Sequence, residues 1–260
     1  MHSSLQGIDA IVCDLDGVVY RGNEALPGAV EAIARMQSAG LRVLFCTNNS
    51  RSTVAQYEEK LSGLGIEVER DLILTSAVVL REVLQARSPR PQRALVIGGD
   101  GIREAVEGAG LELTDGDDAD VVAVGWDPDF TYDVLRRAAF ALHQGAELIA
   151  TNADATFPAE GGRLLPGAGP LVAALEVAGG VKAEILGKPN RPMMEAAAAR
   201  LQLARRIAAV GDRVETDLAG GREMGWRTIL VLSGVTSADQ ADALRPRPDA
   251  VVGSLAELAR

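Results

Sequence analysis

The sequence predicts an α/β protein built on a mainly parallel sheet, with a second, smaller α/β domain inserted into the first. Apolar runs of strand length alternate with amphipathic runs of helix length, which is the pattern of βαβ units. The alternation occurs in two series, and a segment with two prolines, SPRPQR at 88–93, separates them. At 260 residues the chain is long enough for one large domain or two modest ones.

The first series alternates strand and helix over five segments: 8–13, 28–40, 41–46, 53–65 and 72–76. The second series has strands at 93–99, 119–126 and 147–152, a helix that ends near Gly110 and a helix at 131–144. The first series then resumes with a helix at 191–204 and strands at 206–212 and 227–234. We therefore expect a core domain from 1–85 and 181–260, with an inserted domain at 86–180.

Composition excludes several functions. The net charge of −10 argues against nucleic acid as a partner, because binding it normally needs a basic face. No apolar run approaches the roughly 20 residues needed to cross a bilayer, and MHSSLQG lacks the pattern of a signal peptide, so we expect a soluble cytoplasmic protein without a membrane partner. With two cysteines and two histidines, a disulfide framework and a multi-histidine zinc site are excluded.

Four polar clusters stand at the carboxyl ends of predicted strands, or at a helix start that faces them. They are DLDG at 14–17, TNNS at 47–50, GKPN at 187–190 and GDRVETD at 211–217. In open parallel sheets, functional groups collect at that edge. Any one cluster is ordinary turn chemistry, as Asp16-Gly17 would be alone, but four at one edge indicate a site.

The clusters bring the carboxylates of Asp14, Asp16, Asp212 and Asp217 toward one edge. Like charges a few ångströms apart cost about 1–4 kcal/mol per pair. A hard divalent cation removes that cost, and Mg²⁺ suits one or two carboxylates together with a substrate phosphate. One of only three lysines, Lys188, adds a positive charge, so the residues describe a site for a phosphate group and a metal. No GxxxxGK[ST] loop is present, which argues against a nucleoside triphosphate.

These motifs resemble those of the haloacid dehalogenase superfamily, which consists mostly of phosphatases. The resemblance rests on DLDGVVYRG, LPGAVEAI, FCTNNS, GKPN and GDRVETDL, which occur in the family's order and cover nearly the whole chain. In the inserted segment, IATNADATFP and LLPGAG look like the NagD-like branch with its type IIA (C2) cap. The resemblance implies a Rossmannoid core and an inserted cap domain.

The resemblance also implies a role for each matching residue. Asp14 matches the nucleophile that forms an aspartyl-phosphate, and Asp16 matches the general acid and base. Thr47 and Asn48 match the phosphate-holding motif, and Lys188 matches the lysine that neutralises the nucleophile and the phosphate.

The implied Mg²⁺ site uses the carboxylates of Asp14 and Asp212 and the backbone carbonyl of Asp16. As a general acid, Asp16 needs a raised pKa, and a nearby cation would lower that pKa. We therefore expect the Asp16 side chain to point away from the metal. Asp217 matches a supporting carboxylate, which we expect to hold the site together or cap the following helix rather than to touch the metal.

The loop TNADATFP at 151–158 corresponds to a cap loop that selects the substrate in the resembling branch. Asp154 and Phe157 are the candidates, against the alternative that they only build a turn. We expect a Mg²⁺-dependent phosphatase for a small phosphate monoester of the glycerol-phosphate, phosphoglycolate or sugar-phosphate type. A nucleoside monophosphate phosphatase is the alternative.

Two functions of another class stay open. A phosphotransferase or mutase would use the same nucleophile, whereas a non-catalytic phosphometabolite sensor is disfavoured because Asp14 and Asp16 are both present. Caps of this branch often pair, so the resemblance implies a possible homodimer through the cap.

Overall fold

The computed structural model describes residues 2–158 and 164–259, and the chain forms two compact units. Unit 1 consists of Met1–Thr47, Tyr57–Leu74 and Lys188–Arg260, and unit 2 consists of Asn48–Gln56 and Thr75–Gly187. Each unit has its own parallel sheet with helices, so the predicted α/β class with an inserted second domain is confirmed. The predicted domain limits at 86 and 180 stay a prediction.

Unit 1 is built on a six-stranded sheet with the strand order β15-β14-β13-β1-β4-β5. The strands are β1 (Ala10–Cys13), β4 (Arg42–Thr47), β5 (Ile73–Thr75), β13 (Ile207–Gly211), β14 (Arg227–Val231) and β15 (Ala250–Val252). The pairs from β15 to β4 are all parallel. Every residue of β1 and β13 is buried. This is typical of strands in parallel sheets, whose sequences are continuously apolar because both faces are covered.

Helices and a small hairpin complete unit 1. The helices are α1 (Ala29–Ser38), α7 (Arg191–Arg200), α8 (Ala219–Glu223), α9 (Ala238–Ala243), α10 (Leu255–Leu258) and the π-helix η4 (Val214–Leu218). Unit 1 also contains two 3₁₀ turns, η1 (Ser3–Leu5) and η2 (Arg70–Leu72), and the hairpin of β2 (Tyr20–Arg21) with β3 (Glu24–Ala25). The helix α2 (Val54–Gly63) begins in unit 2 and continues in unit 1 from Tyr57.

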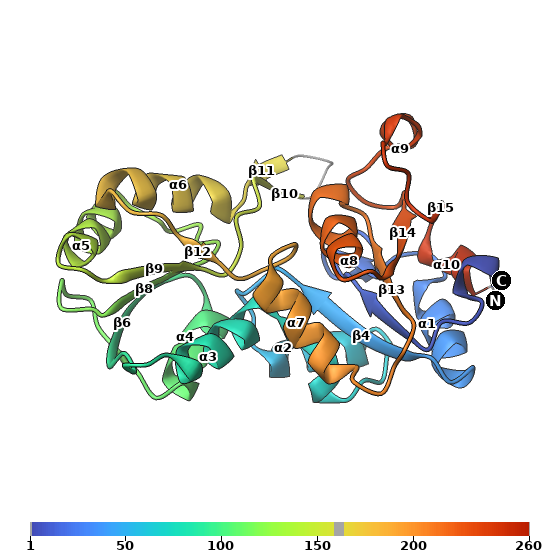
Figure 1. Ribbon diagram of the computed structural model, residues 1–260, viewed down its shortest axis with the longest axis horizontal. Helices are drawn as coiled ribbons and strands as arrows, with labels where there is room; N and C mark the ends of the chain where they lie inside the picture. The colour runs from blue at the N-terminus through green and yellow to red at the C-terminus, as the bar shows by residue number, and fades with distance from the viewer. Residues whose placement is uncertain (1, 159–163, 260) are drawn as a thin grey trace. The chain divides into compact units, whose positions relative to one another are not determined.

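Unit 2 is built on a five-stranded sheet with the order β12-β9-β8-β6-β7, in which every pair is parallel. The strands are β6 (Arg93–Ile97), β7 (Glu112–Leu113), β8 (Val121–Val124), β9 (Glu147–Ala150) and β12 (Glu184–Ile185). The helices are α3 (Ser76–Ala86), α4 (Asp100–Gly108), α5 (Tyr132–His143) and α6 (Ala168–Gly179). Helices α3 and α4 pack together on one face and α5 and α6 on the other (Figure 1). An antiparallel hairpin joins β10 (Thr156–Pro158) and β11 (Leu164–Pro166).

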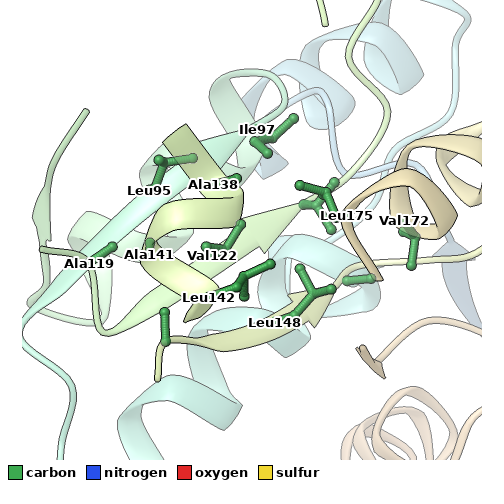
Figure 2. Close-up of a cluster of buried hydrophobic side chains, with 13 residues drawn as sticks. Leu95, Ile97, Ala119, Val122, Ala138, Ala141, Leu142, Leu148, Val172 and Leu175 are labelled. Carbon is green, nitrogen blue, oxygen red and sulfur yellow. The ribbon is translucent and has the colours of Figure 1, made fainter. Parts of the chain in front are cut away.

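The core of unit 2 lies between its sheet and the pair α5 and α6. Leu142 of α5 and Leu175 of α6 pack with Val122 of β8 and Leu148 of β9 (Figure 2). All four side chains are buried. The spacing of apolar residues on both helices therefore serves this unit's own hydrophobic core.

Candidate active site

The polar clusters of unit 1 meet because three of its strands are neighbours in the sheet and parallel. Asp14 follows β1, Thr47 ends β4, and Asp212 follows β13. The carboxyl ends of parallel strands lie at one edge, so these three residues converge there. The predicted gathering of the clusters that follow these strands is therefore present.

Lys188 lies between two of the carboxylates. Its Nζ is 2.5 Å from Asp14 Oδ1 and 2.7 Å from Asp217 Oδ1, and it donates a hydrogen bond of 2.8 Å to the backbone carbonyl of Cys46. The side chain is only 5% exposed. A buried ammonium with three oxygen partners is held in a fixed position, here directly beside Asp14.

Burial and charge act against each other on this cluster. Burial alone would lower the pKa of Lys188, but the carboxylates of Asp14 and Asp217 outweigh it and raise that pKa, so the ammonium stays charged. Burial raises the pKa of Asp14; Lys188 opposes the rise, and the negative charges of Asp217 and Asp212 add to it. Burial, followed by the charge of Asp217, raises the pKa of Asp212 to about 6. The cluster therefore holds more negative charge than one lysine neutralises.

Asp212 occupies a close-fitting cradle. Its Oδ2 accepts a 2.6 Å hydrogen bond from the backbone N–H of Val235, while its Oδ1 is buried without a hydrogen-bond partner. A Cβ on Gly17 would lie 2.8 Å from Oδ2, and a Cβ on Gly234 would overlap it. Two glycines thus make room for a carboxylate that keeps one buried oxygen available.

Asp217 is placed by an unusual turn. The π-helix η4 carries it, and its Oδ2 accepts a hydrogen bond of 3.1 Å from the backbone N–H of Arg213. Carboxylate oxygens of Asp14, Asp212 and Asp217 lie within 4.8 Å of one another, close enough to share a cation. Within the described residues, this group does not include the carboxylate of Asp16.

Asp16 and Thr47 lie beside two tyrosines. The backbone of Asp16 forms an isolated bridge with Tyr20, and Tyr57 of α2 shares a hydrogen bond with the side chain of Thr47. Thr47, Tyr20 and Tyr57 are buried, and Asp16 is half-buried. Burial raises the pKa of Asp16, and the cations Lys60, Lys188 and Arg213 oppose that rise.

Unit 2 brings two further predicted residues together. Asn48 Nδ2 donates to both carboxylate oxygens of Asp154, at 3.2 and 3.3 Å. The Asn48 carbonyl accepts hydrogen bonds from Asn152 Nδ2 and Ser76 Oγ. The backbone of Phe157 lies in β10 and pairs with Leu165 of β11. The prediction for the Phe157 side chain lies outside what the structure describes.

Sequence reasoning missed Tyr57, Lys60 and Gly234. The tyrosine and the lysine lie on the expected helix at 53–65, but nothing in that helix indicates which of its side chains faces the site. Gly234 lies shortly after β14, whose carboxyl end is at the same edge of the sheet. Its place after a predicted strand is the signal that could have identified Gly234 from the sequence.

The comparisons with known proteins agree with this geometry. A family model described as haloacid dehalogenase-like hydrolase matches residues 11–112, and a HAD-hydrolase-like model matches residues 185–258. The acid sugar phosphatase of Staphylococcus saprophyticus is 34% identical over 239 residues, 92% of each chain. The chain belongs to the haloacid dehalogenase-like hydrolases.

Other relatives place this hydrolase among the NagD-like phosphatases. The 5′-nucleotidase YutF of Bacillus subtilis is 35% identical over 94% of both chains. NagD of E. coli K-12 aligns with a TM-score of 0.84 and 32% identity, over 96% of this chain and 98% of that one. The glycerol phosphate phosphatase Rv1692 of Mycobacterium tuberculosis, solved in complex with magnesium, aligns with a TM-score of 0.89 and 33% identity, over 100% of this chain and 79% of that one. The protein is accordingly a phosphomonoesterase of this family.

A membrane-spanning helix is not among the elements that the structure describes, since none of those helices combines the necessary length and apolar character.

Proposed function

We propose that the protein is a Mg²⁺-dependent phosphatase that hydrolyses small phosphate monoesters through an aspartyl-phosphate on Asp14. The observation that carries the proposal is the arrangement around Asp14. Lys188 pairs with this carboxylate on one side, and Asp212, with an unpartnered buried oxygen, belongs to the same cluster. A carboxylate nucleophile that must approach a phosphate needs positive charge beside it, which Lys188 supplies in part and a cation bound at the carboxylate cluster would complete.

In this proposal the side chains divide the chemical steps among them. Asp14 Oδ attacks phosphorus in line with the leaving oxygen, and Lys188 neutralises charge on the attacked phosphate. Thr47 holds the phosphate through its hydroxyl. Asp16 protonates the leaving oxygen and then takes a proton from the water that hydrolyses the acyl phosphate, which returns Asp14 to its starting state.

A divalent cation fits the carboxylate cluster. The buried, unpartnered Oδ1 of Asp212 and the three carboxylates within 4.8 Å are the donor set that a hard cation takes. Asp14, Asp212 and the backbone carbonyl of Asp16 would hold Mg²⁺, with Asp217 in support through its hydrogen bond from Arg213. When bound, Mg²⁺ supplies positive charge against the phosphate oxygens.

The proposed substrate is a small phosphorylated metabolite. Similarity to an acid sugar phosphatase and a glycerol phosphate phosphatase supports a sugar-phosphate or glycerol-phosphate type, and phosphoglycolate is proposed from the sequence resemblance alone. Similarity to a 5′-nucleotidase supports nucleoside monophosphates as the second candidate. Asp154, held by Asn48, and Phe157 are the proposed substrate-selecting residues of unit 2.

The proposed ligand is a small-molecule phosphate ester, and neither nucleic acid nor a membrane is a proposed partner. The proposed location is the cytoplasm. The proposal also includes a homodimer through the inserted domain, which light scattering on the purified chain would test.

The deciding experiment measures inorganic phosphate released from p-nitrophenyl phosphate, glycerol phosphate, phosphoglycolate, sugar phosphates and nucleoside monophosphates. Release is expected with Mg²⁺, is expected to fall to background with EDTA, and is expected to be lost in Asp14→Asn. Asp242→Asn is the matched control, because Asp242 is exposed on α9 and is not one of the clustered carboxylates.

Other outcomes point to the alternatives. Transfer of phosphate to a second metabolite without inorganic phosphate would favour a phosphotransferase or mutase. A folded, Mg²⁺-loaded protein that binds phosphate esters without turning any of them over would favour a sensor.

A further inference from the structure

The segment SGVT at 233–236 contacts the carboxylate cluster of unit 1, although it belongs to none of the four polar clusters of the sequence. The sequence predicts a strand over 227–234, whereas β14 ends at Val231. Beyond that end, the polar groups of residues 233–236 form hydrogen bonds with Asp212 and with Gly17. The segment therefore joins two loops that follow different strands of the sheet.

The segment fixes Asp212 at both its side chain and its main chain. The N–H of Val235 donates to Asp212 Oδ2 at 2.6 Å. Thr236 donates twice to the Asp212 carbonyl, from its hydroxyl at 2.6 Å and from its N–H at 3.3 Å. Thr236 is buried, so water competes little for these hydrogen bonds. The carboxylate is thus held through Oδ2, while Oδ1 is buried without a hydrogen-bond partner among the described residues.

The same segment binds the turn that follows Asp16. The hydroxyl of Ser233 donates a hydrogen bond of 2.8 Å to the carbonyl of Gly17. A Cβ on Gly17 would lie 2.8 Å from Asp212 Oδ2 and 3.1 Å from the Cα of Gly234. The Asp16-Gly17 turn and the Asp212 carboxylate therefore lie against each other, and residues 233–236 are bonded to both.

We propose that Ser233 and Thr236 are positioning residues for the cation site: the Thr236 hydroxyl fixes Asp212, and the Ser233 hydroxyl fixes the turn that carries the Asp16 carbonyl. The inference rests on the proposed function, in which Asp212 and the Asp16 carbonyl hold Mg²⁺. Both hydroxyls act through these ligands, and neither needs to contact the cation.

The chemistry of Mg²⁺ makes this positioning matter. The ion demands near-ideal octahedral geometry with oxygen ligands at about 2.0–2.1 Å, so a small displacement of one ligand weakens binding. Groups that hydrogen-bond to metal ligands typically account for about 10–100-fold in metal affinity. Two hydroxyls on one short segment, each bonded next to a different proposed ligand, would set the spacing between those ligands.

The test measures the affinity of the metal-free chain for Mg²⁺ by isothermal titration calorimetry, without substrate. Thr236→Val removes the hydroxyl and keeps the branched shape of the side chain, so we expect the Kd for Mg²⁺ to rise about tenfold. Thr236→Ser keeps the hydroxyl and should bind Mg²⁺ within about threefold of the parent chain. Rescue by the serine variant would assign the effect to the hydroxyl.

Thr228→Val is the matched control. Thr228 is a buried threonine of β14 in the same sheet, and its hydroxyl binds Asp249 instead of the cluster. Loss of that hydroxyl should lower stability but leave the Kd for Mg²⁺ unchanged. The comparison separates a general loss of stability from a displaced ligand.

Ser233→Ala tests the other hydroxyl, at a half-buried position where a smaller side chain is tolerated. Its Kd for Mg²⁺ should also rise about tenfold. Phosphate release gives a second measurement on both variants. The Mg²⁺ concentration for half-maximal activity should rise by the same factor as the Kd, while kcat at saturating Mg²⁺ stays within about threefold of the parent value.

The two hypotheses fail in different ways. If the parent chain binds no Mg²⁺, or if Asp212→Asn binds it equally well, the proposed metal site is wrong and the positioning role falls with it. If Asp212→Asn abolishes binding, a hydroxyl whose removal leaves the Kd unchanged loses its proposed role. The role is also overturned if Thr228→Val weakens binding as much as Thr236→Val does.

Discussion

At the scale of single residues, the site is a balance between burial and charge. Lys188 is almost wholly buried, and the two carboxylates beside it keep it ionised. Removing one member of such a buried group leaves the remaining charges without compensation. The lysine therefore has a structural task as well as the proposed catalytic one.

Replacing Lys188 by Met tests both tasks. The variant should lose at least about a hundredfold in kcat. Because Asp14 and Asp217 lose their cation, the free energy of unfolding of the metal-free protein should fall by about 3 kcal/mol. Steady-state kinetics and urea titration measure the two effects. Lys182→Met, at an exposed ion pair, should change stability by less than about 1 kcal/mol, and equal effects of the two variants would contradict the argument.

Replacing Gly234 by Ala tests the cradle of Asp212. The added Cβ would overlap Oδ2, so the carboxylate has to move and the Mg²⁺-dependent activity should fall at least about tenfold. Gly63→Ala is the control, because a Cβ there meets nothing within 4 Å. In that variant activity should stay the same. The melting temperature should stay the same or rise slightly, because Ala restricts the unfolded chain more than Gly does. Full activity of Gly234→Ala would show that the cradle tolerates displacement.

The sequence predicts the charged residues of the site better than their neighbours. Asp14, Asp212 and Lys188 stand in short strings whose residue types and order indicate the chemistry. Lys60 and Gly234 have no such string, because their positions depend on how α2 and the segment after β14 pack in three dimensions. Residues whose role arises only from tertiary contacts cannot be predicted from a single sequence.

At the scale of elements, long buried strands and amphipathic helices are predicted well. The expected strand at 93–99 is β6 at Arg93–Ile97, and the expected helix at 131–144 is α5 at Tyr132–His143. The two-residue strand β12 and the short helix α10 are too brief to show any periodicity. The helix expected at 191–204 ends at Arg200.

A carboxylate between two elements should make stability depend on pH. Asp249, just before β15, accepts hydrogen bonds from the backbone N–H and the hydroxyl of Thr228 in β14, chiefly the former, and these lower its pKa. A group with a lowered pKa in the folded state stabilises the fold above its unfolded pKa, and that contribution is lost as the pH falls through the folded value. Chemical denaturation of Asp249→Asn should thus show a shallower loss of stability below about pH 4 than the parent chain. Asp242→Asn, at an exposed position of α9, is the matched control.

At the scale of the whole molecule, each unit has its own sheet and its own buried core. The carboxylate cluster belongs entirely to unit 1, while Asn48 and Asp154 belong to unit 2. The proposed metal site and the proposed substrate-selecting pair therefore depend on different cores. Substitutions in one unit can be compared with substitutions in the other as internal controls.

Metal binding should stabilise the folded chain. The unfolded chain does not hold Asp14 and Asp212 together, so Mg²⁺ at the proposed site would bind the native state and shift the equilibrium toward it. At a hundred times the dissociation constant this amounts to about 2.7 kcal/mol, or a rise in melting temperature of about 5 to 10 °C. Differential scanning fluorimetry with Mg²⁺ and with EDTA measures the rise. Asp212→Asn should abolish most of it, and an undiminished rise in that variant would place the ion elsewhere.

The π-helix η4 has a consequence for how the chain can change length. Its five residues, Val214–Leu218, carry Asp217 back to the N–H of Arg213 and to Lys188. Each residue added to or removed from an α-helix rotates the later residues by about 100° around its axis, and in the wider π-helix the rotation is somewhat smaller. A one-residue deletion or insertion between 213 and 217 would swing the carboxylate away from both partners, although the composition of the segment would hardly change. Substitutions of the exposed side chain of Glu215 should therefore disturb the site less than any change in the number of residues in this segment.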